Sequence, residues 1–343
     1  MKEVKVAIVG FGGIARAHAK GYKKLADEGF PVKVVALCDV DPNKFEGEIK
    51  INLGSAGSQN FFTDVPRFIG ADALLEAGIE FDMADICVPD YLHKELTIKL
   101  LAAGKHVLCE KPMALNTPDC LEMIEAAKKA GTRFMVGQCL RFAPEYVYLK
   151  KLVDSGEYGK PKSIFMNRFS ISPTWGFEDF FRKTEGCGGS IMNLHIHDID
   201  VCRFMFGEPK AVSCISYDAD AKWAMVNSRL LYDGFFVVAN SSFDEAPKVP
   251  FLADFRVRFE GASVIKEGKD VKVYPVDGEP FTAELEKTDG YTEEIRYIAS
   301  LILDEGKEND ANPPESAAAS VRLIELLRES SALGGAEVAP DIK

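Results

Sequence analysis

The stretch Gly188–Asp200, with the sequence GGSIMNLHIHDID, contains two histidines and two aspartates within a few residues of each other. Imidazole and carboxylate groups at such short spacing are typical of a metal site, of a general acid–base centre, or of an amphipathic helix that happens to carry histidine. The whole chain has only five histidines. The choice among these three interpretations depends on what the rest of the chain can place in front of this segment.

The residues around this stretch predict a helix over Ser190–Phe206. Ser190 is a suitable N-cap after two glycines, because its hydroxyl can accept from a main-chain N–H of the first turn. Gly207, followed by Pro209, is a suitable end. The motif is therefore expected on a helix rather than in a loop.

On such a helix, Asn193, His197 and Asp200 share one face, at spacings of four and three residues. His195 points away from that face, so the two histidines cannot easily bind one metal ion. No zinc or iron site is expected, and packing or a hydrogen bond is favoured for His195. Asp200 could orient His197 or form part of a local network.

A glycine loop at the start of the chain predicts a dinucleotide site. It consists of Gly10, Phe11, Gly12, Gly13, Ile14 and Ala15. Gly10 allows a tight turn, Gly12 lets a pyrophosphate approach the main chain, and Ala15 lets helix and strand pack closely. The helix N-terminus adds N–H donors and a partial positive charge. By itself such a loop could also be a structural turn.

The second strand strengthens this interpretation, because it ends in Asp39 at the expected distance along the chain. A carboxylate there binds the adenosine ribose and repels a 2′-phosphate. No arginine follows Asp39 directly, which favours NAD over NADP, although Lys44 lies close by in the sequence.

Glu110, Lys111 and Pro112 follow a buried strand in the sequence HVLCEKP. Ligands of open α/β sheets lie beyond the carboxyl ends of the strands, so Lys111 is expected on the cofactor side. Pro112 restricts the main chain, and the peptide bond before it can be cis. The alternative is an ordinary charged turn.

The whole chain reads as an α/β protein with two domains. Up to about residue 140, continuously apolar strands alternate with helices, which predicts a doubly wound, mostly parallel Rossmann sheet. Residues 141–343 show alternating apolar and polar patterns, which predict an α/β domain with an open, mostly antiparallel sheet. The last helix could pack back on the Rossmann domain.

The composition of the chain argues against some classes of binding partner and indicates a compartment. The formal net charge of −12 argues against nucleic acid and anionic membranes, and no apolar run is long enough to cross a bilayer. The eight cysteines occur singly within apolar segments, without metal spacing, which predicts buried thiols in a reducing compartment. A cytoplasmic protein is expected.

Five segments together resemble the glucose–fructose oxidoreductase / inositol dehydrogenase / rhizopine catabolism (Gfo/Idh/MocA) family. They are GFGGIA, CDVDP, VPDYLHKELTIKLLAAGKHVLCEKPMA, QCLRFAPEY and GGSIMNLHIHDIDVCRFMFGEP. The resemblance covers nearly the whole chain. It implies a Rossmann domain followed by an open-sheet domain, and an NAD(P)-dependent oxidoreductase of sugars, polyols or related small molecules. It also implies a homodimer or homotetramer.

The resemblance further implies a role for each matching residue. The glycine loop holds the pyrophosphate, and Asp39 the adenosine ribose. Pro89, His93 and Arg141 lie near the cofactor, with His93 on the nicotinamide side, although a histidine at a helix start can also serve as a cap. Glu110 positions the nicotinamide ribose.

For catalysis, the resemblance implies that Lys111 contacts both cofactor and substrate, and that His197 exchanges a proton with the substrate hydroxyl. The sequence departs from the family at Asn193, where many members have aspartate. An amide can orient a hydroxyl but cannot ionise. His195 also replaces the glycine that is commonest at its position.

Further candidates for the substrate pocket are Trp175, Asp200 and Tyr291. The indole of Trp175 could form one wall for a sugar ring, or anchor a loop by apolar contacts. Three hypotheses follow: a dehydrogenase of secondary hydroxyl groups, a glycosidase or epimerase with tightly bound NAD, and a cofactor-dependent sensor without catalysis.

Overall fold

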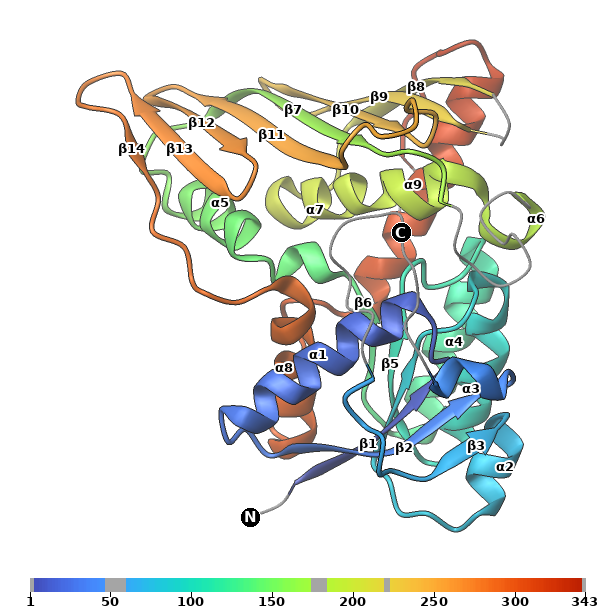
Figure 1. The fold of residues 1–343 in the computed structure, drawn as a ribbon. Coiled ribbons are helices and arrows are strands. Elements are labelled where there is room, and N and C mark those ends of the chain that lie inside the picture. The colour runs from blue at the N-terminus through green and yellow to red at the C-terminus, as the bar shows by residue number, and fades with distance from the viewer. Residues whose placement is uncertain (1–2, 47–59, 174–183, 219–222, 341–343) are drawn as a thin grey trace. The chain divides into compact units, whose positions relative to one another are not determined.

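The computed structural model describes residues 3–46, 60–173, 184–218 and 223–340 (Figure 1). Within these residues the chain forms two compact units. The first takes its residues from Met1–Cys139 and Asp289–Ala318. The second takes its residues from Leu140–Pro173, Phe181–Thr288 and Ala319–Lys343. No helix in the described part of the chain is long and apolar enough to cross a membrane.

The first unit contains the expected parallel sheet. Its strands are β1 (Val4–Val9), β2 (Val32–Asp39), β3 (Arg67–Ile69), β4 (Met83–Ile86), β5 (His106–Glu110) and β6 (Phe134–Gly137). They lie in the order β3-β2-β1-β4-β5-β6, and all neighbours run parallel. The chain reverses its winding between β1 and β4, and ligands of such sheets bind at that switch point, beyond the carboxyl ends of the strands.

Helices cover both faces of this sheet. They are α1 (Gly13–Asp27), α2 (Ala71–Glu76), α3 (His93–Ala102), α4 (Thr117–Ala130) and α8 (Gly290–Leu303), and α9 (Pro314–Ala332) begins here. In Figure 1, α1 and α8 lie on one side of the sheet and α3 and α4 on the other. Strands β1 and β4 are buried from both sides, which explains their continuously apolar sequences.

The second unit is built on an eight-stranded sheet. Its strands are β7 (Pro161–Phe169), β8 (Ala211–Tyr217), β9 (Met225–Leu231), β10 (Phe236–Ser242), β11 (Leu252–Phe259), β12 (Ala262–Glu267), β13 (Asp270–Pro275) and β14 (Phe281–Thr282). Their order is β14-β13-β12-β11-β7-β10-β9-β8. Neighbouring strands are antiparallel, except that β10 runs parallel to β7. The α/β fold class and both sheet types are thus as predicted.

Helices α5 (Pro144–Ser155) and α7 (Ile196–Phe206) lie along one face of the second sheet (Figure 1). A short helix, α6 (Thr184–Cys187), precedes a π-helical turn over Ile191–His195 that leads into α7. The other face of the sheet carries no helix in the described part of the chain.

Two expectations for this helix need correction. Residues Ile191–His195 of the predicted helix Ser190–Phe206 are π-helical rather than α-helical, so spacings counted on a regular α-helix do not apply there. Ser190 is not a side-chain cap, because its main chain is already helical (φ −62°, ψ −29°) and its hydroxyl donates to the carbonyl of Trp223 instead. Gly207 ends the helix as predicted, with a φ of 76°.

Candidate active site

Gly10 can only be glycine. Its φ of +85° lies in the left-handed region, and its N–H donates to the carbonyl of Cys38 at 2.7 Å. A Cβ added here would lie 2.6 Å from the carbonyl oxygen of Cys87. The turn between β1 and α1 can therefore pack against the loop after β4 only without a side chain.

Among the described residues, the space that a Cβ would occupy is free at Gly12, whereas it is filled at Gly10. Its φ is −80°, which any residue can adopt, and an added Cβ would meet no atom of the described residues within 4 Å. No side chain caps α1, and its first turn holds no acidic residue. Gly13 starts the helix, Ile14 is half-buried and Ala15 is fully buried. This combination leaves main-chain N–H groups and space for a pyrophosphate, so the loop fits the expected cofactor.

Asp39 is fixed beside the glycine loop. One carboxylate oxygen accepts from the N–H of Phe11 at 2.6 Å, and the other accepts from the N–H of Asp41 at 2.9 Å. Each oxygen keeps a further acceptor position, so a ribose hydroxyl can still donate to this carboxylate.

Glu110 and Lys111 lie at the carboxyl end of β5, on the same edge of the parallel sheet as the glycine loop. Glu110 is 4% exposed and accepts from the N–H of Lys111 at 3.0 Å, while its other oxygen lies 2.9 Å from Nε2 of His18. Burial opposes ionisation, but His18 and Lys111 outweigh it, so the pKa of Glu110 is lowered. The Lys111–Pro112 peptide bond is cis, as the sequence allowed.

His93 lies between two loops of this edge. Its ring is fully buried at the start of α3, with Nδ1 2.7 Å from the carbonyl of Pro112 and Nε2 3.0 Å from that of Val88. Burial lowers the pKa of His93, although both carbonyls act in the opposite direction. Pro89 stands directly before a short 3-10 helix, Asp90–Leu92. Both contacts are to carbonyls and not to N–H groups of α3, so the ring is not the expected helix cap, and a neutral ring donates to only one of the two. The place of His93 beside the nicotinamide stays a prediction.

In the second unit, the segment with two histidines is largely buried. The amide of Asn193, 6% exposed, donates to the carbonyl of Cys187 at 2.7 Å. His195 is fully buried and lies 2.7 Å from the hydroxyl of Ser228 on β9, so it packs against the sheet as expected. Burial, reinforced by Arg168, lowers the pKa of His195 to about 3. His197 is half-buried in the first turn of α7.

Arg141 and Asp200 form a buried ion pair. Nε and Nη2 of Arg141 donate to the two carboxylate oxygens of Asp200 at 2.8 and 2.7 Å. Ser320 donates to the same carboxylate at 2.7 Å. Of the two roles expected for Asp200, the geometry favours the local network. A contact of either residue with cofactor or substrate stays a prediction.

The remaining candidates are placed differently. Tyr291 belongs to α8 of the first unit, where its ring centroid lies 5.5 Å from that of His18. Trp175 lies outside the described residues. Three buried residues near Glu110 were not predicted from the sequence: His18, which contacts Glu110, and Asp85 and Glu294, which lie near His18. Asp85 within the apolar strand sequence MADI was the one signal for them.

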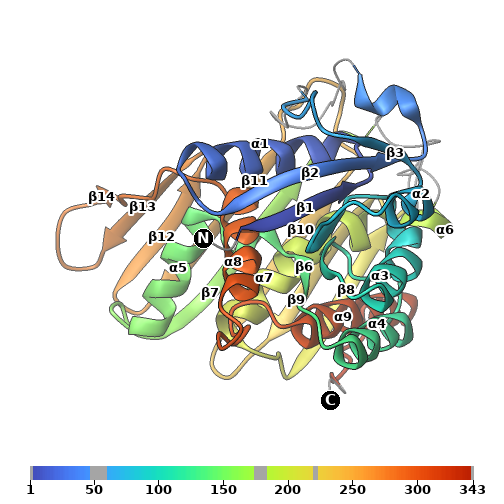
Figure 2. The same cartoon turned by 90° about the horizontal axis from the view of Figure 1, so that it is seen from below.

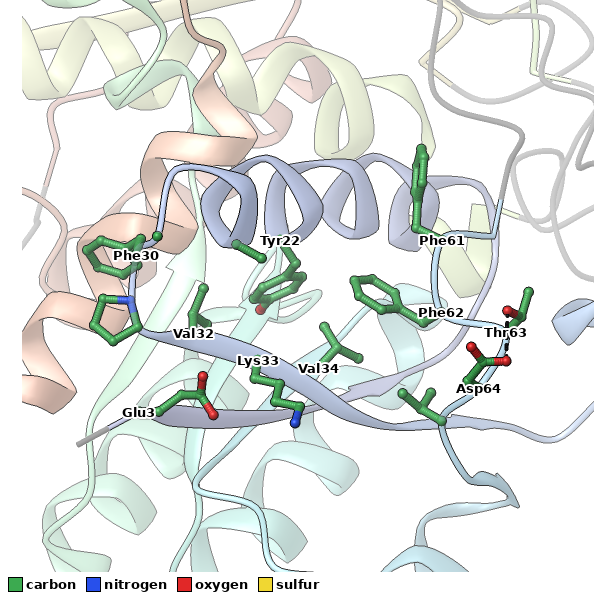
Figure 3. A pocket seen from close by; sticks show the side chains of 14 residues that line it. Glu3, Tyr22, Phe30, Val32, Lys33, Val34, Phe61, Phe62, Thr63 and Asp64 are labelled. Carbon is green, nitrogen blue, oxygen red and sulfur yellow. Dashed lines mark hydrogen bonds between the residues drawn. The ribbon is translucent and has the colours of Figure 1, made fainter. Parts of the chain in front are cut away.

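A cavity of about 590 Å³ lies elsewhere in the first unit (Figure 3). Tyr22 of α1, Val32 to Val34 of β2, and Phe61 and Phe62 line it. Val32 to Val34 form the amino end of β2, whereas the glycine loop lies at the carboxyl edge of the sheet. Figure 2 shows the same strand from below. This cavity is therefore separate from the candidate dinucleotide site.

Comparison with known proteins agrees with this geometry. Residues 4–138 match the model of an oxidoreductase family with an NAD-binding Rossmann fold, GFO_IDH_MocA. Residues 146–262 match the C-terminal domain model of the same family. The two matches follow each other along the chain and together span most of it.

Relatives of known name are enzymes. The chain is 35% identical over 145 residues to 2,7-anhydro-N-acetylneuraminate hydratase of Escherichia coli, covering 42% of this chain and 38% of the relative. It is 30% identical over 205 residues to myo-inositol 2-dehydrogenase of Thermotoga maritima, covering 60% and 55%. The matches thus span about half or less of these relatives' lengths.

A solved structure shows the same fold over the whole chain. Levoglucosan dehydrogenase in complex with NADH and L-sorbose superposes with a TM-score of 0.82 and 18% identity, covering 99% of both chains. Together, the glycine loop, the two sheets and both domain matches show that the chain belongs to the Gfo/Idh/MocA family of oxidoreductases with an NAD-binding Rossmann fold.

Proposed function

We propose that this protein is an NAD-dependent dehydrogenase that oxidises a secondary hydroxyl of a sugar, an inositol or a related polyol, or reduces the corresponding ketone. The observation that carries the proposal is the glycine loop. Gly12 leaves the main chain open in front of an uncapped helix, and Asp39 is fixed at its side. The names of the relatives, among them an inositol dehydrogenase, support the substrate class.

The first unit supplies the residues that hold the cofactor. The loop that consists of Gly10, Gly12, Gly13, Ile14 and Ala15 would hold the pyrophosphate. Asp39 would bind the adenosine ribose and Glu110 the nicotinamide ribose. The Asp39 carboxylate repels a 2′-phosphate, which favours NAD over NADP. NAD, when bound, supplies the hydride acceptor.

Three residues are proposed to act on the substrate: His197, Lys111 and Asn193. His197 takes the proton of the substrate hydroxyl. Lys111 donates to the same oxygen and stabilises the negative charge that develops there. Asn193 orients a neighbouring hydroxyl through its amide. The substrate carbon would lose a hydride to the nicotinamide, so that oxidation of the substrate and reduction of the cofactor would balance.

Absorbance at 340 nm with a panel of inositols, aldoses and alditols tests the proposal. We expect NADH to form with at least one of them, and Lys111→Met and His197→Gln to lower kcat by about 10²–10⁴-fold. NAD binding, measured by fluorescence, should survive His197→Gln. A wild-type protein that binds NAD but turns over none of the substrates would contradict the dehydrogenase.

A second candidate function uses NAD without net reduction. The bound cofactor would oxidise a hydroxyl, an elimination or epimerisation would follow, and the same hydride would return. Asn193 in place of the usual aspartate favours it, as does a relative that is named a hydratase. Mass spectrometry of the purified protein, which detects a retained dinucleotide, and assays for aryl-glycoside cleavage distinguish the two candidate functions. Product formed without accumulating NADH would establish this function over the first.

We also propose a cytoplasmic location. All eight cysteines are buried thiols without disulfides, as expected for a protein of a reducing compartment.

We further propose a homodimer or homotetramer that uses the helix-free face of the second sheet. Large exposed apolar side chains gather on that face: Phe165, Ile215, Tyr217, Met225, Phe236 and Leu252. Sedimentation velocity on a Phe165→Lys, Phe236→Lys variant should show a smaller species. Leu121→Lys on α4, which is 53% exposed, is the control.

A further inference from the structure

His18 makes two hydrogen bonds that a neutral imidazole cannot make together. It is fully buried in α1, a few residues beyond the glycine loop. Its Nδ1 lies 2.8 Å from Oδ2 of Asp85, and its Nε2 lies 2.9 Å from Oε1 of Glu110. A neutral ring has one N–H, whereas an imidazolium has two. With two carboxylates as partners, the ring carries both protons.

Asp85 anchors this ring. It is fully buried at β4, and the oxygen that faces His18 also accepts from the hydroxyl of Tyr22 at 3.0 Å. The thiol of Cys87 lies 3.6 Å from its other oxygen. The Asp85 carboxylate therefore fixes the position of the His18 ring from the side opposite to Glu110.

Glu294 is the third carboxyl group of the cluster. It comes from α8, is fully buried, and its Oε1 lies 3.7 Å from Nε2 of His18. Neither of its oxygens has a hydrogen-bond partner among the described residues. Burial raises the pKa of Glu294 well above its ordinary value, and Glu110 adds to this, against the opposing effect of His18. The carboxyl groups within hydrogen-bond distance of the ring are thus those of Asp85 and Glu110.

We propose that His18 is a positioning residue, which holds the Glu110 carboxylate ionised and correctly turned at the carboxyl end of β5. This inference rests on the proposed role of Glu110 toward the nicotinamide ribose. One oxygen of Glu110 is held by His18 and the other by the N–H of Lys111. Gly137 on β6 leaves room for it, because a Cβ there would lie 3.3 Å from Oε1. His18 thereby links the glycine-loop helix to the strand end that carries Lys111.

The groups that face His18 all favour its charged form or are neutral. Burial alone would lower the pKa of His18, but Asp85 and Cys87 raise it well above its ordinary value. The ring is surrounded by side chains from several parts of the first unit. Asp85 comes from β4, Cys87 from the loop after β4, and Glu110 from β5. Tyr22 comes from α1, and Tyr291 and Glu294 come from α8.

NMR of the apo protein tests the charge of the ring without any assay. With 15N-labelled histidine, the chain gives signals from only five side chains, and His18→Gln identifies the one at issue. We expect both ring nitrogens of His18 to carry protons at pH 8. A neutral ring at that pH would overturn the proposal even if His18→Gln failed to fold.

The pH profile tests the positioning role. In His18→Gln the side-chain amide can still donate but carries no charge, so the pKa of Glu110 should rise and the acid limb of NAD affinity and of kcat/KM should move to higher pH. At neutral pH we expect both quantities to fall by about 10–100-fold, since a neutral donor replaces a charged one. His106→Gln, at the opposite end of β5, is the control and should leave the limb in place. If His18→Gln lowers NAD affinity and kcat/KM equally at every pH, and the acid limb does not move, then His18 has only a structural role.

The variant Glu294→Gln distinguishes the positioning role of His18 from the binding of a metal cation by the same cluster. Nε2 of His18 and one oxygen each of Glu110 and Glu294 lie within 4.8 Å of one another, as metal ligands would. Under the proposal Glu294 is already neutral, so the acid limb stays in place and added Zn²⁺ does not raise the melting temperature. Stabilisation by Zn²⁺ that Glu294→Gln abolishes would overturn the proposal. If wild-type protein shows the charged ring and binds NAD but turns over no substrate, only the proposed reaction fails.

Discussion

The main-chain N–H of Phe11 donates to Oδ2 of Asp39 at 2.6 Å, which ties the glycine loop to the end of β2. The glycine loop, which is expected to hold the pyrophosphate, therefore also orients the Asp39 carboxylate. This carboxylate is expected to bind the adenosine ribose. Such mutual fixation favours one cofactor geometry before any ligand binds.

Replacing Asp39 should weaken cofactor discrimination. A hydrogen bond to a charged group contributes about 1.5–3 kcal/mol, so Asp39→Ser should lower NAD affinity by about 10–100-fold. NADP should bind better than to the wild type, because a repelling charge is lost. Fluorescence titration with both cofactors measures this. Asp41→Ser changes the same turn and should preserve the preference. An unchanged ratio in Asp39→Ser would refute the assignment.

Two glycines of one loop should respond in opposite ways. Gly10→Ala forces a side chain into the left-handed region, which costs about 1–2 kcal/mol, and against the Cys87 carbonyl, so it should unfold at lower temperature. Gly12→Ala should keep the wild-type melting temperature but lose at least about tenfold in NAD affinity, because its Cβ fills the approach to the main chain. Thermal unfolding and NAD titration of both variants check this. Equal effects of both would contradict it.

The Arg141–Asp200 pair should stabilise the second unit. Arg141→Met leaves a buried carboxylate without its partner, which should cost about 3–5 kcal/mol in the free energy of unfolding. Arg141→Met with Asp200→Leu should recover part of that loss, since no charge stays buried. Urea unfolding measures both. Lys210→Met, which removes a solvent-exposed pair with Asp233, is the control. A double variant less stable than the single one would argue against this account.

His195 should make stability depend on acid pH. Its pKa is about 3 in the folded protein, against 6.5 as its ordinary value, so the folded state binds fewer protons between these pH values. The free energy of unfolding should then fall as pH drops from 6.5 toward 3, with His195 contributing about 1.4 kcal/mol per pH unit. His195→Gln should flatten the slope by that amount. Ser228→Ala, which keeps the imidazole, should retain it.

Replacing Asn193 by aspartate should not raise the proposed activity. The Asn193 amide donates to the Cys187 carbonyl, a bond that a carboxylate cannot make. Asn193→Asp should therefore cost about 1–3 kcal/mol in stability and leave kcat no higher than in the wild type. Unfolding and turnover measurements decide. A faster and equally stable variant would show that the asparagine is dispensable.

Local sequence patterns were sufficient for most elements. The apolar runs that end in Gly10 and Asp39 predicted β1 and β2, because a strand buried on both faces is continuously apolar. Strand β3, with three partly exposed residues, and the short α2 were not predicted, since neither is long enough to show a period. The π-helical turn was missed because residue types do not distinguish its hydrogen bonds from those of an α-helix.

By itself, the sequence determined the sheet types, the glycine loop and its acidic partner, because each depends on residues close together in the chain. Only the tertiary structure decided which charged groups meet. His18 reaches Asp85 and Glu110 across 67 and 92 residues, and Arg141 reaches Asp200 across 59. Such contacts are selected by the requirement that a buried charge find a partner once packing has removed water, and no local pattern specifies which partner that is.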